Sequence, residues 1–452
     1  MKIKLYRSAT VGIIFKDFKL LCDPWLTDGE YYGSWYHFPK FNFDKNSIKD
    51  LNSYDAIYIS HIHPDHCSEK TLSKIDKNIP IYIHSYHAKF LKFKLSNLGF
   101  NVIELVNNKK LKLSKSAYIN IVAADNCDPE LCYKFTGCAE LKKTNGSQQI
   151  DSYAFIGDKK NTILNVNDCP FELAHISLKR SLKEYKKIDL ILTGYGGAGP
   201  YPQCFDNLKL IEKKKEAILK KNKFLRKAIN YIELVKPKFY LPFAGKYVLG
   251  GKLSSLNNLK GVPELTEAYK IIEKHFAKKN ENKPKPLELN PGSSYNFDDN
   301  SYSSKYKPID KKSLGIFIQK ISKKKFLYDK DPMPKFDQIK ELCQGAFPRY
   351  LAKNKQLGNF FDTSIYINFK IGIIKLSLSE EKLSFFKKGS LNKNLKNNFV
   401  EYTLHPKLLA RLLRGPRYAH WNNAEIGSHI KYFRKPNVFN RRVYQSICYF
   451  HN

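Results

Sequence analysis

The chain has 452 residues, 42% of them hydrophobic, which suffices for two or three domains with a sizeable core. No apolar run reaches the roughly 18 residues that a membrane-spanning helix needs, so the sequence predicts no membrane span. The formal net charge is +36, but only ten of the 78 basic residues are arginine. This lysine excess indicates a composition bias over a solvated surface; a polyanionic partner such as nucleic acid is the alternative, and an anionic small substrate agrees with either.

The cysteines and the N-terminal residues indicate the cellular compartment in which the protein is expected. Nine cysteines are scattered without paired spacing, which favours a reducing environment. Charges interrupt the N-terminal apolar run, and no small-residue cleavage site follows it. We therefore expect a cytoplasmic location.

In chain order, residues 1–25 alternate apolar and polar side chains and predict an antiparallel hairpin that leads into a loop at Asp23. Short strands are expected at 55–60, 79–85, 101–106, 117–125, 152–158 and 161–168, and helices at 68–76 and at 88–99, where Gly99 closes the second one. Strands with interspersed helices are typical of an α/β layered sandwich.

The second half of the chain divides into further segments. Residues 203–236 have apolar side chains at helical spacing, a strand and a glycine-bearing loop follow at 236–252, and residues 261–279 predict a last helix. We expect a first domain over 1–279, a Pro-, Asn- and Ser-rich linker or wrapping segment over 280–312, and a smaller mixed domain over 313–452 that closes over a substrate.

The stretch "AIYISHIHPDHCSEK" places four metal-binding side chains just after a buried strand. His61 and His63 lie two residues apart, and Asp65 and His66 follow at once. Imidazoles and a carboxylate suit zinc, iron and similar ions, and a strand that ends in a loop gives ligands a rigid mount. The sequence therefore predicts a metal site here.

This H-x-H-x-D-H pattern resembles that of the metallo-β-lactamase superfamily. The resemblance implies a four-layer αβ/βα sandwich with one or two metal ions at its edge. It assigns His61 and His63 to one metal position and Asp65 and His66, which are also the candidate catalytic residues, to the other. Asp168, after the apolar run "ILNVN", takes the place of the bridging aspartate, and Asp128 is the candidate for an intermediate ligand that is often a histidine.

Further stretches resemble one branch, the CMP-N-acetylneuraminic acid hydroxylases. They are "LCDPWLTDGEYYGSWYHFP" at 21–39, "LNVNDC" at 164–169, "GYGGAGPYPQCF" at 194–205 and "LVKPKFYLPFAGKYV" at 234–248, with an echo at 417–436. The branch also fits the absence of a late histidine, since Ala244 and Gly245 stand in that loop. The resemblance implies an iron-dependent oxygenase that hydroxylates an N-acyl group on a nucleotide-linked sugar.

Electron supply is where the chain departs from this branch, which also carries a Rieske iron–sulfur domain. A Rieske centre needs two Cys and two His ligands, usually in paired C-x-H and C-x-x-H motifs. That pair of motifs does not occur in this sequence. We therefore expect electrons to come from a separate protein, unless the chemistry is not oxidative.

Two regions are candidates for substrate binding. The loop "TGYGGAGPYP" offers close backbone approach at Gly196 and Gly197 and aromatic rings at Tyr195 and Tyr201; a plain loop is the alternative. Arginines concentrate near the C-terminus, where Arg414 and Arg417 are candidates for gripping a phosphate or carboxylate, and a solvated helix face is the alternative.

Three functions follow from these features. The first is an iron oxygenase acting on an anionic sugar nucleotide. The second is a zinc- or manganese-dependent hydrolase of a phosphodiester, ester or amide bond, in which bound metal activates water. The third is a non-catalytic polyanion-binding protein, which the charge of +36 suggests.

Overall fold

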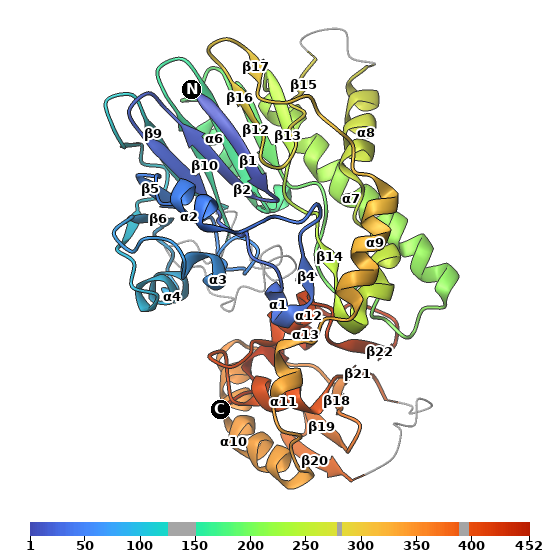
Figure 1. The fold of residues 1–452 in the computed structure, drawn as a ribbon. Helices are drawn as coiled ribbons and strands as arrows, with labels where there is room; N and C mark the ends of the chain where they lie inside the picture. The colour runs from blue at the N-terminus through green and yellow to red at the C-terminus, as the bar shows by residue number, and fades with distance from the viewer. Residues whose placement is uncertain (125–150, 278–282, 388–396) are drawn as a thin grey trace.

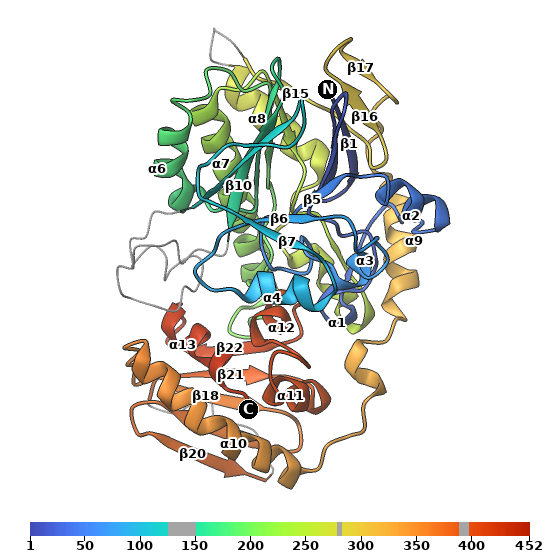
Figure 2. The same ribbon diagram turned by 90° about the vertical axis from the view of Figure 1, so that its left-hand side faces the viewer.

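The computed structural model describes residues 1–124, 151–277, 283–387 and 397–452, and Figures 1 and 2 show their arrangement in two views. The first of two large sheets has the strand order β17-β16-β1-β2-β3-β5-β6-β7. Its strands are β1 Lys2–Arg7, β2 Thr10–Ile14, β3 Lys19–Cys22, β5 Ala56–Tyr58, β6 Ile81–His84, β7 Val102–Leu105, β16 Ser294–Asn296 and β17 Ser301–Tyr302. The predicted hairpin of residues 1–25 is confirmed, since β1, β2 and β3 pair antiparallel.

The second large sheet has the order β15-β13-β12-β11-β10-β9-β8. Its strands are β8 Leu111–Lys112, β9 Tyr118–Ala123, β10 Ser152–Gly157, β11 Thr162–Asn167, β12 Leu190–Thr193, β13 Phe239–Pro242 and β15 Lys285–Pro286. Alternate side chains of a strand point to opposite faces, so each strand serves two apolar layers. In β10, Ala154 and Ile156 join the core between the sheets, whereas Tyr153 and Phe155 face the helices outside.

Helices cover the outer face of each sheet. The first sheet packs on α2 Lys45–Leu51, α3 Glu69–Leu72 and α4 Phe90–Asn97, and the second on α6 Phe171–Ser181, α7 Leu210–Val235 and α8 Leu265–Ala277. The order helix, sheet, sheet, helix confirms the predicted αβ/βα sandwich. The helix expected at 68–76 is shorter than predicted, and Gly99 follows α4 with a φ of +89°.

The segment expected to be a linker or wrapping segment runs along both sheets. β15 pairs with β13 of the second sheet, and β16 adds an antiparallel edge strand to β1 of the first. The next helix, α9 Lys311–Ser322, packs on the small sheet of β4 Trp35–Tyr36 and β14 Val248–Leu249 and on the 3-10 helix η1 Gly251–Leu259. This part of the chain is therefore integrated into the sandwich.

The C-terminal part forms a second α/β unit, below the sandwich in Figure 1. Its sheet has the order β20-β19-β18-β21-β22, with strands β18 Ser364–Asn368, β19 Ile373–Ser377, β20 Lys382–Phe386, β21 Phe399–Thr403 and β22 Lys431–Lys435. Around it lie α10 Phe336–Gln356, α11 Pro406–Leu413, α12 Trp421–Ile426, α13 Arg441–Ser446 and the 3-10 helices η2 Leu327–Lys330 and η3 Ile447–Tyr449. Within the described residues, no helix is long and apolar enough to cross a bilayer.

A short helix of the sandwich, α1 Glu30–Gly33, holds the two units together (Figure 1). The hydroxyl of Tyr32 accepts a hydrogen bond of 2.7 Å from the backbone N–H of His420, at the start of α12. His429 Nε2 donates to the backbone oxygen of Tyr31 at 2.7 Å. The C-terminal unit thus closes against the loop region beside the histidine motif.

Candidate metal centre

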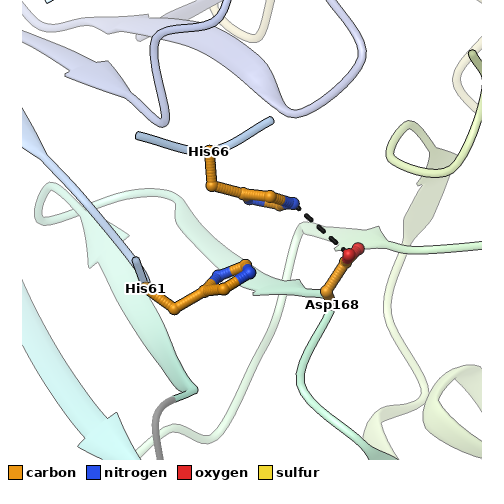
Figure 3. Close-up of side chains that lie close together, drawn as sticks. All are labelled: His61, His66 and Asp168. Atoms are coloured by element: carbon orange, nitrogen blue, oxygen red, sulfur yellow. Dashed lines mark ion pairs between the residues drawn. The ribbon is translucent and has the colours of Figure 1, made fainter. Parts of the chain in front are cut away.

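The candidate centre lies where strands of the two large sheets end at a common edge. The loop after β5 carries His61 and His66, and Asp168 follows β11 of the second sheet directly. Figure 3 shows the three side chains pointing toward one another across the edge of the sandwich. The strand-end geometry expected from the sequence is therefore present for these three residues.

The ligand atoms of His61, His66 and Asp168 all lie within 4.8 Å of one another. His66 Nε2 is 3.4 Å from Asp168 Oδ2, and the two imidazole ring centres are 4.2 Å apart. Both histidines are buried, whereas the Asp168 side chain is 35% exposed. The group therefore has one face open to solvent, as a reactive metal site requires.

Two hydrogen bonds at Ser60 fix the ring orientation of His61. The Ser60 hydroxyl donates to Asp23 Oδ2 at 2.7 Å and therefore accepts from His61 Nδ1, 3.0 Å away. His61 Nε2 is then the unprotonated nitrogen, and it is buried without a hydrogen-bond partner among the described residues. A buried polar atom without a partner is costly, and a metal ion would satisfy it.

Asp23 orients His66 as well. His66 Nδ1 donates to Asp23 Oδ2 at 2.8 Å, which leaves Nε2 to face Asp168. Asp23 is itself fully buried, at the end of β3, and Cys22 of β3 pairs with Tyr58 of the parallel neighbour β5. Carboxylates that receive the second N–H of a metal-binding histidine are a recurrent feature of metal sites. Asp23 was predicted only as a loop position and not as a site residue, although a strand that ends in aspartate, as at Asp168, is the signal that marks it.

The electrostatics of the two histidines differ. Burial lowers the pKa of His61 well below its ordinary value, with neighbouring His66 and His63 adding to the effect. Burial also acts against a charge on His66, but the carboxylates of Asp168 and Asp23 outweigh it and raise the pKa of His66 well above the ordinary value. Metal ligation needs neutral imidazoles, so a cation would take the place of the His66 proton.

The other two predicted ligands of the motif lie beside this group. His63 Nε2 donates to Asn422 Oδ1 of α12 at 3.3 Å, so the nitrogen that would bind a metal is engaged by the C-terminal unit. Asp65 Oδ2 is 3.8 Å from His66 Nε2, and Asp65 Oδ1 accepts a hydrogen bond from the Tyr31 hydroxyl. Burial raises the pKa of Asp65.

Replacing Asn422 by alanine should free His63 Nε2 and raise metal affinity about fivefold, because a neutral hydrogen bond contributes about 1 kcal/mol. Titration with a competing chelator measures this change. Asn423→Ala is the matched control, since Asn423 also comes from α12 but interacts with the Tyr32 hydroxyl. Equal affinities for both variants would mean that His63 does not contribute to metal binding.

Two further aspartates are candidate neighbours of the histidines, one predicted from the sequence and one found in the structure. Asp128, the predicted intermediate ligand, lies outside the described residues. Asp151, which precedes β10, places Oδ1 3.8 Å from His61 Nδ1. Burial and the nearby Asp168 raise the pKa of Asp151 to about 7. Asp151 was not predicted, because no strand end or motif marks it.

The glycine loop lies on the open side of the centre. Gly196 and Gly197 line a small cavity of about 80 Å³ together with Asp168. A side chain at Gly197 would overlap the Phe224 ring, so glycine is needed there for packing. The aromatic candidates lie elsewhere: Tyr195 is buried against α7 and α8 and offers no ring surface to a substrate, and Tyr201 packs near Phe205.

The arginine candidates lie in a different and larger space. Arg414 and Arg417 line a cleft of about 690 Å³ between the sandwich and the C-terminal unit. Pro64 and Cys67 of the histidine loop form part of its opposite wall. The two predicted substrate regions are therefore separate: the glycine loop lies beside Asp168, and the arginine-lined cleft lies on the side of Pro64 and Cys67.

No protein-family model matches the chain. Among curated proteins, it is 27% identical over 251 residues to a Mycolicibacterium smegmatis protein named as a Rieske 2Fe-2S iron–sulfur protein. It is 26% identical over 259 residues to the cytidine monophosphate-N-acetylneuraminic acid hydroxylase of Mus musculus, and 24% over 263 residues to an inactive form from Homo sapiens. These matches span 54%, 55% and 55% of this chain but only 43%, 39% and 45% of the relatives.

Solved structures with a similar arrangement include an isothiocyanate hydrolase from Delia radicum gut bacteria, with a TM-score of 0.44, 17% identity and coverage of 66% of this chain and 99% of that chain. Another is CmlA, a diiron β-hydroxylase from Streptomyces venezuelae, with a TM-score of 0.41, 13% identity and coverage of 63% and 52%. At these scores they add nothing to the topology described above. The sequence relatives and the His-His-Asp group together support a metal-dependent enzyme.

Proposed function

We propose that this chain is an iron-dependent oxygenase that resembles the CMP-N-acetylneuraminic acid hydroxylases and acts on an anionic sugar nucleotide. The observation that carries the proposal is the convergence of two imidazoles and one carboxylate, His61, His66 and Asp168, with an unpartnered His61 Nε2. Two histidines and one carboxylate with open positions are the donor set of non-haem iron oxygenases. Sequence relatives that bear the hydroxylase name match 55% of this chain.

Bound iron would activate dioxygen, and the chain's own residues prepare the site for it. Asp23 and Ser60 hold both histidines with Nε2 toward the centre, and Asp168 supplies the anionic ligand on the solvent side. One oxygen atom enters a C–H bond of the substrate. The other would leave as water, with two electrons from a separate electron-transfer protein and two protons from solvent. A cytoplasmic location is part of the proposal.

A hydrolase is the second candidate, because the same donor set also suits catalytic zinc with an open position for water. The partly exposed Asp168 side chain leaves the open position on the solvent side, where water can enter. In this case the bond that breaks is an ester, amide or phosphodiester, and neither oxygen nor electrons are consumed.

Metal analysis and an oxygen test distinguish the two candidates. Protein purified without oxygen should contain iron, and with a chemical reductant and CMP-N-acetylneuraminic acid it should give a product that gains one oxygen atom, labelled when ¹⁸O₂ is used. Asp168→Ala should lose both iron and product. Zinc or manganese in the protein together with product formation in the absence of oxygen would instead establish the hydrolase.

A further inference from the structure

The cleft between the two units has the dimensions of a small-molecule site. Its volume is about 690 Å³, within the roughly 300–1,000 Å³ typical of ligand pockets. Tyr31 and Tyr32 of α1 form one wall, and the other comes from the segment before α10 and from the turn between α11 and α12. The Tyr31 hydroxyl donates to Asp65, and Pro64 also lines the cleft, so the cleft borders the histidine motif.

The charge of this cleft is unbalanced. Among the described residues that line it, seven are lysine or arginine and three are acidic. Two of the acids are paired with cations: Asp331 accepts two hydrogen bonds from Arg411, and Glu69 lies 3.4 Å from Lys94. The cations left over, among them Lys335 at the start of α10, give the cleft a positive potential that favours an anion.

Arg414 and Arg417 have no partner that would explain their position. Both are exposed, and in the described part of the chain neither side chain forms a hydrogen bond or a salt bridge. The charge of Arg414 acts on Asp331, but the hydrogen bonds of Asp331 come from Arg411. Arg414 ends α11, and Arg417 lies in the turn that follows Gly415. Guanidinium groups bind phosphate with paired hydrogen bonds, so two of them in the lining of one cleft suit a phosphate.

Apolar surface lies next to these arginines. Tyr418 is 53% exposed and Met333 is 57% exposed, and both line the cleft. Pro332 and Pro334 extend this surface. Exposed aromatic and thioether groups beside paired arginines suit a ligand with a flat ring and a phosphate, because the ring can stack while the phosphate is gripped.

We propose that this cleft binds a nucleoside phosphate, with the phosphate on Arg414 and Arg417 and the base against Tyr418 and Met333. The proposal rests on the proposed function for its biological setting, in which the ligand is the nucleotide part of the substrate. The sugar then extends past Pro64, which lies between His63 and Asp65 in the chain, toward the centre.

Calorimetric titration of the full chain, freed of metal by a chelator, tests the proposal with cytidine monophosphate as the probe. Cytidine monophosphate should bind, and cytidine without phosphate should bind at least about tenfold more weakly, since hydrogen bonds to charged groups are strong. Arg414→Gln combined with Arg417→Gln should lower the affinity at least about tenfold. Lys214→Gln with Lys215→Gln, on the exposed face of α7, removes the same charge and should change little.

Tyr418→Ala tests the base contact separately, because it should weaken cytidine monophosphate binding but leave pyrophosphate binding unchanged. Equal losses in the two double variants, or equal affinities for pyrophosphate and cytidine monophosphate, would overturn the proposal. Binding of cytidine monophosphate in this titration requires neither bound metal nor catalytic turnover. Specific binding without oxygen-dependent product would therefore count against the oxygenase alone, whereas product formation without specific binding would count against the cleft alone.

Discussion

Replacing His61 or His66 by glutamine should remove the bound metal and all measurable turnover. Each histidine presents Nε2 to the group with Asp168, and glutamine keeps size and polarity but supplies no imidazole nitrogen. Loss of a ligand should exceed the roughly 10- to 100-fold decrease in affinity that follows loss of a residue supporting a ligand. Elemental analysis after purification without oxygen measures the metal directly, and activity should fall by at least about 100-fold.

Thermal unfolding gives an independent measure of the same loss. A metal at about 100 times its dissociation constant stabilises a folded protein by about 2.7 kcal/mol. Added metal should therefore raise the melting temperature of the natural protein but not of either variant. His84→Gln is the matched control, because His84 is also buried and its Nδ1 also lacks a partner, although it lies outside the His-His-Asp group. Equal loss of metal in the His84 variant would contradict the assigned site.

The sequence predicted those features of the centre that depend on residues close together in the chain. An apolar run followed by His61 and His66 marks one strand end, and the apolar run before Asp168 marks another. The resemblance to the metallo-β-lactamase superfamily then assigned these residues to one metal site. The layered α/β sandwich follows from the order of strands and interspersed helices. These features depend on local residue order, which a single sequence shows.

Contacts between distant segments could not be predicted in the same way. Asp23 reaches His66 only because β3 pairs in parallel with β5, a register that no local pattern specifies. The contact between His63 and Asn422 joins residues 359 positions apart. The sequence showed that arginines concentrate near the C-terminus, but it did not show that Asp331 forms its hydrogen bonds with Arg411 and none with Arg414.

Asp23→Asn should weaken metal binding by about 10- to 100-fold, because one buried carboxylate holds both histidines. Asp23 Oδ2 accepts from His66 Nδ1 and from the Ser60 hydroxyl, and Oδ1 accepts from the Ser60 backbone N–H at 2.7 Å. An amide can accept at only one of its two atoms. Either the bonds at the Oδ2 position that support both histidines are lost, or the amide NH2 group faces the Ser60 backbone N–H and is repelled by it. Ser60→Ala removes the link to His61 but leaves the direct bond between Asp23 and His66, so it should cost less, about tenfold.

If Asp23 and Ser60 had only a structural role, their substitution would lower the stability of the fold but would not lower metal affinity in this graded order. Metal affinity from competition with a chelator, measured on protein shown by circular dichroism to be folded, should therefore follow the order natural protein, Ser60→Ala, Asp23→Asn. Activity should recover in part at saturating metal, since the three ligands remain. Asp55→Asn is the matched control: Asp55 Oδ2 accepts from the backbone N–H of Lys19 at the opposite end of β3, 2.7 Å away, and has no link to the histidines. If Asp23→Asn binds metal as tightly as Asp55→Asn, the two imidazoles are held by packing, and the network through Asp23 and Ser60 does not prepare the centre for metal.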